Sequence, residues 1–179
     1  MESGCHSPIL LRINGGELMA KFKLDDNFKR KLEKQCQEKA KSLAKEARDK
    51  LYDKYISLID WYYVDYMPKL NKYDEPYYTR TFNLYNSAHK YYLNSHNSIF
   101  YGGVDINSLG MSDYPGKNGD GINAEGLLGK FIYNPSGTWH GGDWHGGYGI
   151  SADFNIYKEM HKYRDELYKE LQDRCKVKI

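Results

Sequence analysis

The sequence predicts an α+β domain in which a long N-terminal helix and a C-terminal helix pack on a small antiparallel sheet with long loops. Two stretches carry apolar residues at helical spacing, and a shorter stretch between them alternates as strands do. A helix buries one stripe and a strand buries one face, so these segments need one another to form a core. The 179 residues suffice for a single domain, which is expected over residues 19–179.

The first helix is expected to begin at Asp25 or Asp26, because either carboxylate can accept hydrogen bonds from the free amides of a helix start. Apolar or small residues then recur every three or four positions, and no Gly or Pro interrupts them until Pro68. This stripe consists of Phe28, Leu32, Cys36, Ala40, Leu43, Ala47, Leu51, Tyr55, Leu58 and Tyr62.

The length of this helix raises a question about its place in the fold. About 40 helical residues would span roughly 60 Å, which is longer than a domain of this size is wide. A kinked core helix is the favoured interpretation, and a projecting arm that meets a partner is the alternative. Ala40, Ala44 and Ala47 make the middle of the helix thin, which suits close packing of another helix.

The remaining elements follow from alternation, turn residues and a second helical stripe. We expect one helical turn or strand over residues 79–87, strands over residues 98–106 and 127–133, and Gly-rich loops over residues 108–123 and 134–149. A final helix, capped by Asp153, completes the fold. Its apolar face consists of Ile156, Met160, Tyr163, Leu167, Leu171 and Cys175.

The first 18 residues are expected to be a non-native or disordered extension. They show no helix or strand period, and no basic region precedes their short apolar run as a signal peptide requires. Residues 14–19 can be encoded by a bacterial ribosome-binding sequence followed by a start codon. Met19 is therefore the expected natural start, which intact mass spectrometry of protein made from the native gene would test.

The composition indicates an ordered chain with uneven charge. Mean hydropathy is −0.80, yet 15% of the residues are aromatic, unlike disordered chains. The formal net charge is +2, but residues 19–54 hold 12 Lys/Arg against 7 Asp/Glu and residues 55–150 hold 6 against 9. Opposite fields on two parts of one chain suit head-to-tail self-association, and a solvated helix face is the alternative. Cys5, Cys36 and Cys175 have no disulfide or metal-ligand spacing, which favours a reducing compartment.

Residues 61–87 form the most informative stretch, because Tyr residues crowd into a segment that also contains Pro68 and Pro76. A solvated linker rarely carries so many aromatics, and a buried loop would leave backbone groups unpaired. The segment is therefore expected to lie across another surface, in its own domain or in a neighbouring subunit. Tyr and Arg together are typical of interfaces.

The order of motifs resembles the tail-completion or head–tail joining proteins of long-tailed bacteriophages. A long basic helix is followed by a Tyr/Pro run and by a Gly-containing strand over residues 98–104. The matching positions are Trp61, Tyr62, Pro68, Pro76, Tyr77, Tyr78, Arg80, Thr81, Asn83, Leu84 and Ser87. The resemblance covers about residues 28–104 and, loosely, the C-terminal helix. The doubled Trp-His-Gly-Gly of this chain departs from the short His-Gly loop of the family.

The resemblance implies a non-enzymatic structural protein of the virion neck that needs no cofactor or metal. It would form a homo-oligomeric ring, with a hexamer as the working expectation, between the connector and the tail tube. The protein would reside in the host cytoplasm before assembly, with weak DNA contact at most and no membrane. The interface residues expected are Tyr77, Tyr78, Arg80, Thr81, Tyr85, Trp139 and Trp144. An internal Arg80–Asp65 pair is the alternative for Arg80.

Two other functions remain open on the sequence. The first is nucleic-acid binding, since Lys and Arg on the first helix could meet phosphates, although Glu33, Glu38, Glu46 and Asp49 dilute that charge. The basic residues concerned are Lys29, Arg30, Lys31, Lys34, Lys41 and Lys45.

The second alternative is a metal-dependent hydrolase built on the doubled Trp-His-Gly-Gly. His140, Asp143 and His145 could ligate Zn²⁺, but the surrounding glycines give little support to fixed ligand directions. A loop that Trp139 and Trp144 anchor to a neighbour is the favoured interpretation.

Overall fold

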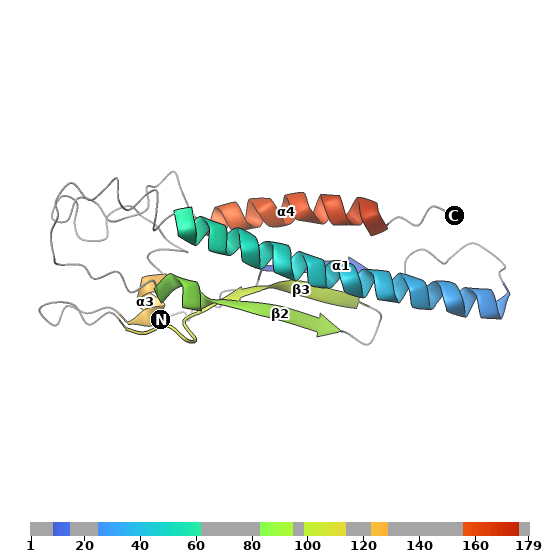
Figure 1. Cartoon of the computed structure of the whole chain (residues 1–179), viewed down its shortest axis with the longest axis horizontal. Helices are drawn as coiled ribbons and strands as arrows, with labels where there is room; N and C mark the ends of the chain where they lie inside the picture. Colours follow the sequence, from blue (N-terminus) through green and yellow to red (C-terminus); the bar gives the residue numbers. More distant parts are fainter. Residues whose placement is uncertain are drawn as a thin grey trace, which may run out of the picture.

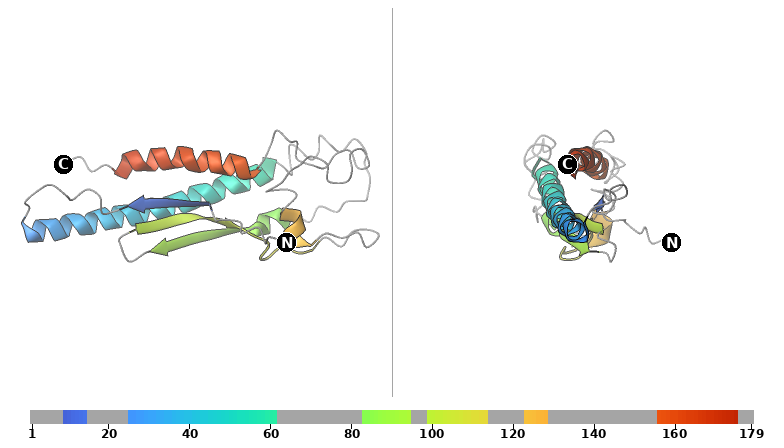
Figure 2. Two further views of the ribbon diagram at one scale, coloured as in Figure 1. Left: turned by 180° about the vertical axis from the view of Figure 1, so that it is seen from behind. Right: turned by 90° about the vertical axis from the view of Figure 1, so that its right-hand side faces the viewer.

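The computed structural model describes residues 9–14, 25–61, 83–94, 99–113, 123–128 and 156–175. These ranges form an α+β fold, which confirms the predicted class. The elements are β1 (Ile9–Asn14), α1 (Asp26–Asp60), η2 (Asn83–Ser87), β2 (Ala88–Asn94), β3 (Ile99–Ile106), α3 (Ala124–Leu128) and α4 (Ile156–Cys175). Helix α1 runs along the sheet, and α4 packs against α1 and β1 (Figure 1). The view from behind shows the same order, with α1 between α4 and the strands β2 and β3 (Figure 2).

The sheet has three antiparallel strands in the order β1-β3-β2. The central strand β3 confirms the strand expected over residues 98–106. Its even-numbered residues are all buried and face α1, while those of the opposite face, Gly103 excepted, are only half-buried. One face of the sheet thus contributes to the core, as is usual for antiparallel sheets.

Strand β1 lies inside the first 18 residues, where no strand was expected. Its six residues pair with β3 from Ile9↔Val104 to Asn14↔Ile99. The continuous apolar run at its start hides the alternation that would have indicated a strand, and pairing with β3 decides its conformation. The expected start at Met19 stays a prediction. A chain beginning there would lack β1, so the edge of β3 with which β1 pairs would lose its partner.

Helix α1 is one helix of 35 residues, so the favoured kinked core helix is wrong and the projecting alternative describes it better. Asp25 occupies the N-cap position as predicted, but its side chain makes no capping hydrogen bond. Residues 26–35, which we call the arm, are exposed apart from the half-buried Leu32. The arm extends past the sheet and past the end of α4 (Figure 1). From Cys36 to Leu58 the predicted stripe is buried, as is Ile59 next to it.

The thin middle of α1 packs closely on a strand, a partner that the sequence had not indicated. Ala44 is fully buried and its backbone lies directly over Gly102 of β3. A Cβ atom built on Gly102 would lie 1.7 Å from the carbonyl oxygen of Ala44. The contact therefore requires glycine at this position in the central strand.

The C-terminal half of the fold confirms one prediction and corrects another. Ile156, Met160, Leu167 and Leu171 of α4 are buried, as the predicted apolar face requires. The strand expected over residues 127–133 is wrong at its start, because Leu128 ends helix α3, while residues 129–133 lie outside the described ranges. Local capping explains the helix. Asn123 accepts the amide hydrogen of Gly126, and Asp113 accepts that of Ala124, both at 2.8 Å.

A buried polar contact fixes η2 against α1. The Tyr55 hydroxyl lies 2.6 Å from Ser87 Oγ, which itself donates to the carbonyl oxygen of Leu84 at 2.6 Å. Tyr55 and Ser87 are both fully buried, so water cannot replace either bond. The helical turn that was one of two expectations for residues 79–87 is therefore present at Asn83–Ser87.

Candidate interaction surfaces

Of the predicted interface residues, only Tyr85 falls within the described ranges. The structure describes no placement for Tyr77, Tyr78, Arg80, Thr81, Trp139 or Trp144. The alternative partner of Arg80, Asp65, also lies outside the described ranges. The interface role of these residues stays a prediction.

Tyr85 is held by its own chain. Its hydroxyl donates a hydrogen bond of 2.5 Å to Asp60 Oδ1, which ties η2 to the last turn of α1. Burial, followed by the hydrogen bond and the charge of Asp60, raises the pKa of the Tyr85 phenol to about 12. This internal contact gives Tyr85 a structural role, because it joins α1 and η2, the two described elements that flank residues 62–82 in the sequence.

Tyr85 is expected to titrate with a pKa of about 12, above its ordinary value of 10.0. Because the folded-state pKa is raised, the stability that this contact contributes is complete below pH 10 and is lost as the pH rises through 12. The difference in phenolate absorbance between the wild type and Tyr85→Phe measures this titration. Asp60→Asn should shift the pKa back toward 10. A Tyr85 pKa near 10 in the wild type would show that Asp60 does not hold the hydroxyl.

The arm is a charged surface with one exposed aromatic residue. Phe28 is 53% exposed and starts the apolar stripe that is buried from Cys36 onward. Four basic and two acidic residues surround it, and all of them are exposed. These are Asp26, Lys29, Arg30, Lys31, Glu33 and Lys34. An exposed Phe within a basic helix face is a candidate contact for an acidic or amphipathic partner.

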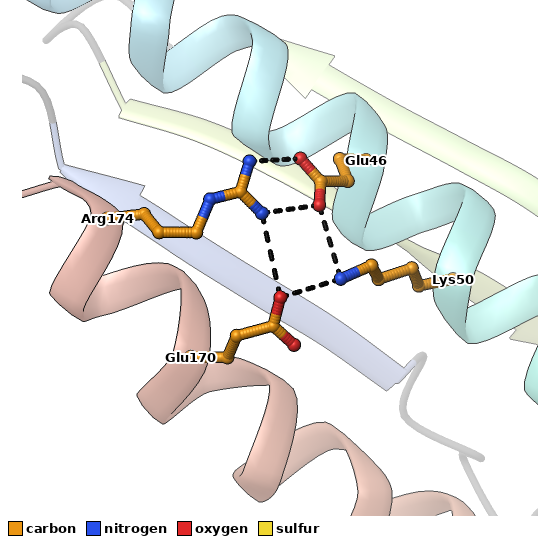
Figure 3. A network of polar contacts seen from close by, with 4 residues as sticks. All are labelled: Glu46, Lys50, Glu170 and Arg174. Atoms are coloured by element: carbon orange, nitrogen blue, oxygen red, sulfur yellow. Dashed lines mark hydrogen bonds and ion pairs between the residues drawn. The ribbon is translucent and has the colours of Figure 1, made fainter.

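An ion-pair network joins α4 to the part of α1 that follows the arm in the sequence (Figure 3). The two terminal guanidinium nitrogens of Arg174 donate to the carboxylate of Glu46, at 2.6 and 2.9 Å. Lys50 bridges Glu46 at 3.2 Å and Glu170 at 2.7 Å. The Arg174 hydrogen bond lowers the pKa of the Glu46 carboxyl below its ordinary value of 4.5, despite the opposing effect of burial. The network orients α4 on α1, and the helical stripes alone did not predict it.

Glu46→Gln is expected to lower the free energy of unfolding at neutral pH. Because the folded-state pKa of Glu46 is depressed, its contribution is present above the unfolded pKa and is lost as the pH falls through the folded pKa. The difference between variant and wild type should therefore shrink in acid below pH 4.5 and in high salt. Urea unfolding at several pH values measures it, with the exposed Glu166→Gln as the matched control. A pH-independent difference would contradict an electrostatic role.

Strand β2 presents an edge that no described residue pairs with, and sequence reasoning missed this surface. It is the outer strand of the sheet and pairs with β3 alone. Leu93 is 46% exposed on this strand, and Tyr91 and Tyr101 on the same face are half-buried. Residues 88–93 contain two adjacent Tyr residues and no Gly or Pro, a composition that could have indicated a strand.

Neither a metal site nor a membrane span appears in the part of the chain that the structure describes. Within these ranges no three His, Cys, Asp or Glu side chains are grouped to hold a metal ion. His140, Asp143 and His145 lie outside the ranges, so the metal alternative is untested. None of the described helices is long and apolar enough to cross a membrane.

Comparisons with protein-family models, with curated proteins and with solved structures find no match for this chain.

Proposed function

We propose that this chain is a non-enzymatic assembly protein of the head–tail junction of a long-tailed phage or prophage. Copies form a ring between the connector and the tail tube. The observation that carries the proposal is the arm, a charged stretch of helix that its own core does not use. The motif order of residues 28–104, which resembles tail-completion proteins, supports the same function.

The physical argument concerns what keeps the arm helical and exposed. Most helical stability in proteins comes from packing of an amphipathic face, and isolated short helices are marginal in water. The arm extends a well-packed helix by ten residues while leaving Phe28 unburied, so a partner would supply the missing contacts. A ring of identical copies provides such a partner at every position.

Inactivating the gene in the phage or prophage that encodes it tests this function. Full heads and free tails should then accumulate unjoined in electron micrographs of the lysate. Complementation with Phe28→Asp should fail to restore joined particles, whereas Leu109→Asp, at a residue that is 71% exposed outside the arm, should restore them. Joined particles at wild-type yield without the protein would reject the proposal.

Nucleic-acid binding is the second candidate, and the observation in its favour is also on the arm. Lys29, Arg30, Lys31 and Lys34 are exposed there, and no described residue pairs with them. Since Asp26 and Glu33 share the surface, we expect weak binding without sequence preference. Submicromolar affinity near physiological salt, falling steeply as salt rises, would instead favour nucleic-acid binding as the main function.

A further inference from the structure

We propose that Cys36 and Cys175 are a redox-sensitive thiol pair, which forms a disulfide between α1 and α4 at the point where the arm leaves the core. The oxidant is a small disulfide of the glutathione type. This inference goes beyond the proposed function and does not depend on it, because both cysteines are described residues of one chain.

The fold brings together two cysteines that are far apart in the sequence. Cys36 is the first buried residue of α1 after the arm, and Cys175 is the last residue of α4. The two helices pack against each other, and the last turn of α4 lies beside α1 close to the start of the buried stripe (Figure 1, Figure 2). Cys175 is half-buried against the core cluster. Both thiols therefore lie on the core side of their helices.

Ion pairs hold this end of α4 on α1. Arg174, which directly precedes Cys175, donates to both carboxylate oxygens of Glu46 (Figure 3). A disulfide needs its two Cα atoms roughly 4.4–6.8 Å apart. Because Cys175 ends its helix and helix ends fray, its backbone can adjust toward Cys36 while Arg174 keeps the last turn in place.

The electrostatics of Cys175 place the same two residues close together. Burial raises the pKa of the Cys175 thiol above its ordinary value of 9.0, and the positive charges of Lys39 and Arg174 oppose this effect. The negative charge of a Cys36 thiolate raises the pKa further. Since charges are screened beyond roughly 10 Å at moderate salt, Cys36 and Lys39 both lie near the Cys175 sulfur. They are neighbours on one side of α1.

The difference in exposure sets the order of the chemistry. Cys175 is the more exposed thiol, so its thiolate attacks one sulfur of oxidised glutathione, forms a mixed disulfide and releases one glutathione thiolate. The Cys36 thiolate then attacks the Cys175 sulfur, forms the bond between the helices and releases the second glutathione. The two released thiolates take up the two protons that the cysteines lose. Two protein thiols are thereby oxidised, and one glutathione disulfide is reduced to two thiols.

The disulfide would join the first long helix to the last and close almost the whole domain into one loop. Such a bond stabilises a fold mainly by restricting the unfolded chain. The thermal midpoint should rise by about 5–15 °C on oxidation, and the gain should be lost when a dithiol reductant is added. In a reducing compartment the pair stays as thiols, and both cysteines are free in the structure.

Oxidation of the purified full chain with oxidised glutathione tests the pair. The reaction is run at about pH 8, where a larger thiolate fraction speeds exchange. After free thiols are blocked, peptide mass spectrometry without reduction should find Cys36 linked to Cys175 in protein of monomer mass. Cys36→Ser and Cys175→Ser should each abolish both the link and the rise of the thermal midpoint, whereas Cys5→Ser should keep both.

A displaced thiol is the matched control for proximity. The double variant Cys36→Ser, Glu33→Cys moves the α1 thiol about one turn into the exposed arm. Its link to Cys175 should form at least about tenfold more slowly, because the effective thiol concentration falls. Equal rates for the double variant and the wild type would overturn the inference. So would Cys36 and Cys175 that carry only separate glutathione adducts, or a Cys36–Cys175 link found only in protein of doubled mass.

Discussion

Gly102→Ala is expected to destabilise the fold by about 3 kcal/mol or more, at the upper end of overpacking effects. The added methyl group would lie 1.7 Å from the carbonyl oxygen of Ala44 and 2.6 Å from its carbonyl carbon. Both are backbone atoms of a buried helix, so no side chain can rotate away, and α1 must separate from β3. Urea unfolding followed by circular dichroism measures the change.

Gly110→Ala is the matched control for this substitution. Gly110 has a φ of 85°, and a Cβ there would meet only the carbonyl oxygen of Asn86 at 3.5 Å. The cost should be about 1–2 kcal/mol, the penalty of a side chain in a left-handed conformation. If Gly102→Ala costs no more than Gly110→Ala, the close contact between α1 and β3 does not exist.

Leu51→Ala is expected to cost about 2–5 kcal/mol, the range for truncating a fully buried leucine. Leu51 is fully buried in α1 and belongs to the cluster that joins α1, α4 and the sheet. Its removal leaves a cavity in a place where elements from three parts of the chain meet, so collapse around it is limited. Chemical denaturation should show a lower midpoint with an unchanged slope.

Leu109→Ala removes the same atoms from an exposed position and serves as the control. Leu109 is 71% exposed, so its truncation should change the free energy of unfolding by less than about 0.5 kcal/mol. Similar effects for the two leucines would mean that α1 does not form the centre of the core.

The two long helices and β3 could be predicted because each carries its own burial signal. The stripe from Cys36 to Leu58 and the stripe of α4 repeat every three or four residues over many turns. Strand β3 alternates around Gly102, and this glycine marks the close approach of α1. Where one face of a helix or strand lies against the core, apolar residues recur in the sequence with the period of that element.

The elements that the sequence did not reveal depend on contacts with distant residues. Strand β1 is short and begins with a continuous apolar run, so only its pairing with β3 distinguishes it. Helix α3 depends on Asp113, which accepts the amide hydrogen of Ala124 although it lies ten residues before Asn123 in the sequence. The exposure of Phe28 could not be inferred either, because the apolar stripe continues into the arm without a change of period.

The interface residues expected from the sequence stay a prediction, because Tyr85 is the one residue among them that the structure describes. Tyr85 was expected at a subunit contact, and the structure shows its hydroxyl on Asp60 of the same chain. The position of β2 at the edge of the described sheet depends on strand order, which short strands do not encode locally. The ion pairs between Glu46 and Arg174 depend on the docking of α4 on α1.

Native mass spectrometry of the purified full chain, over a range of protein concentrations, tests the assembly function most directly. A ring predicts one dominant oligomer with a fixed copy number, because a heterologous contact that closes on itself stops growing. Phe28→Asp should shift that oligomer toward monomer without loss of helical content. A chain that stays monomeric at every concentration, or that grows into open-ended polymers, would contradict the account.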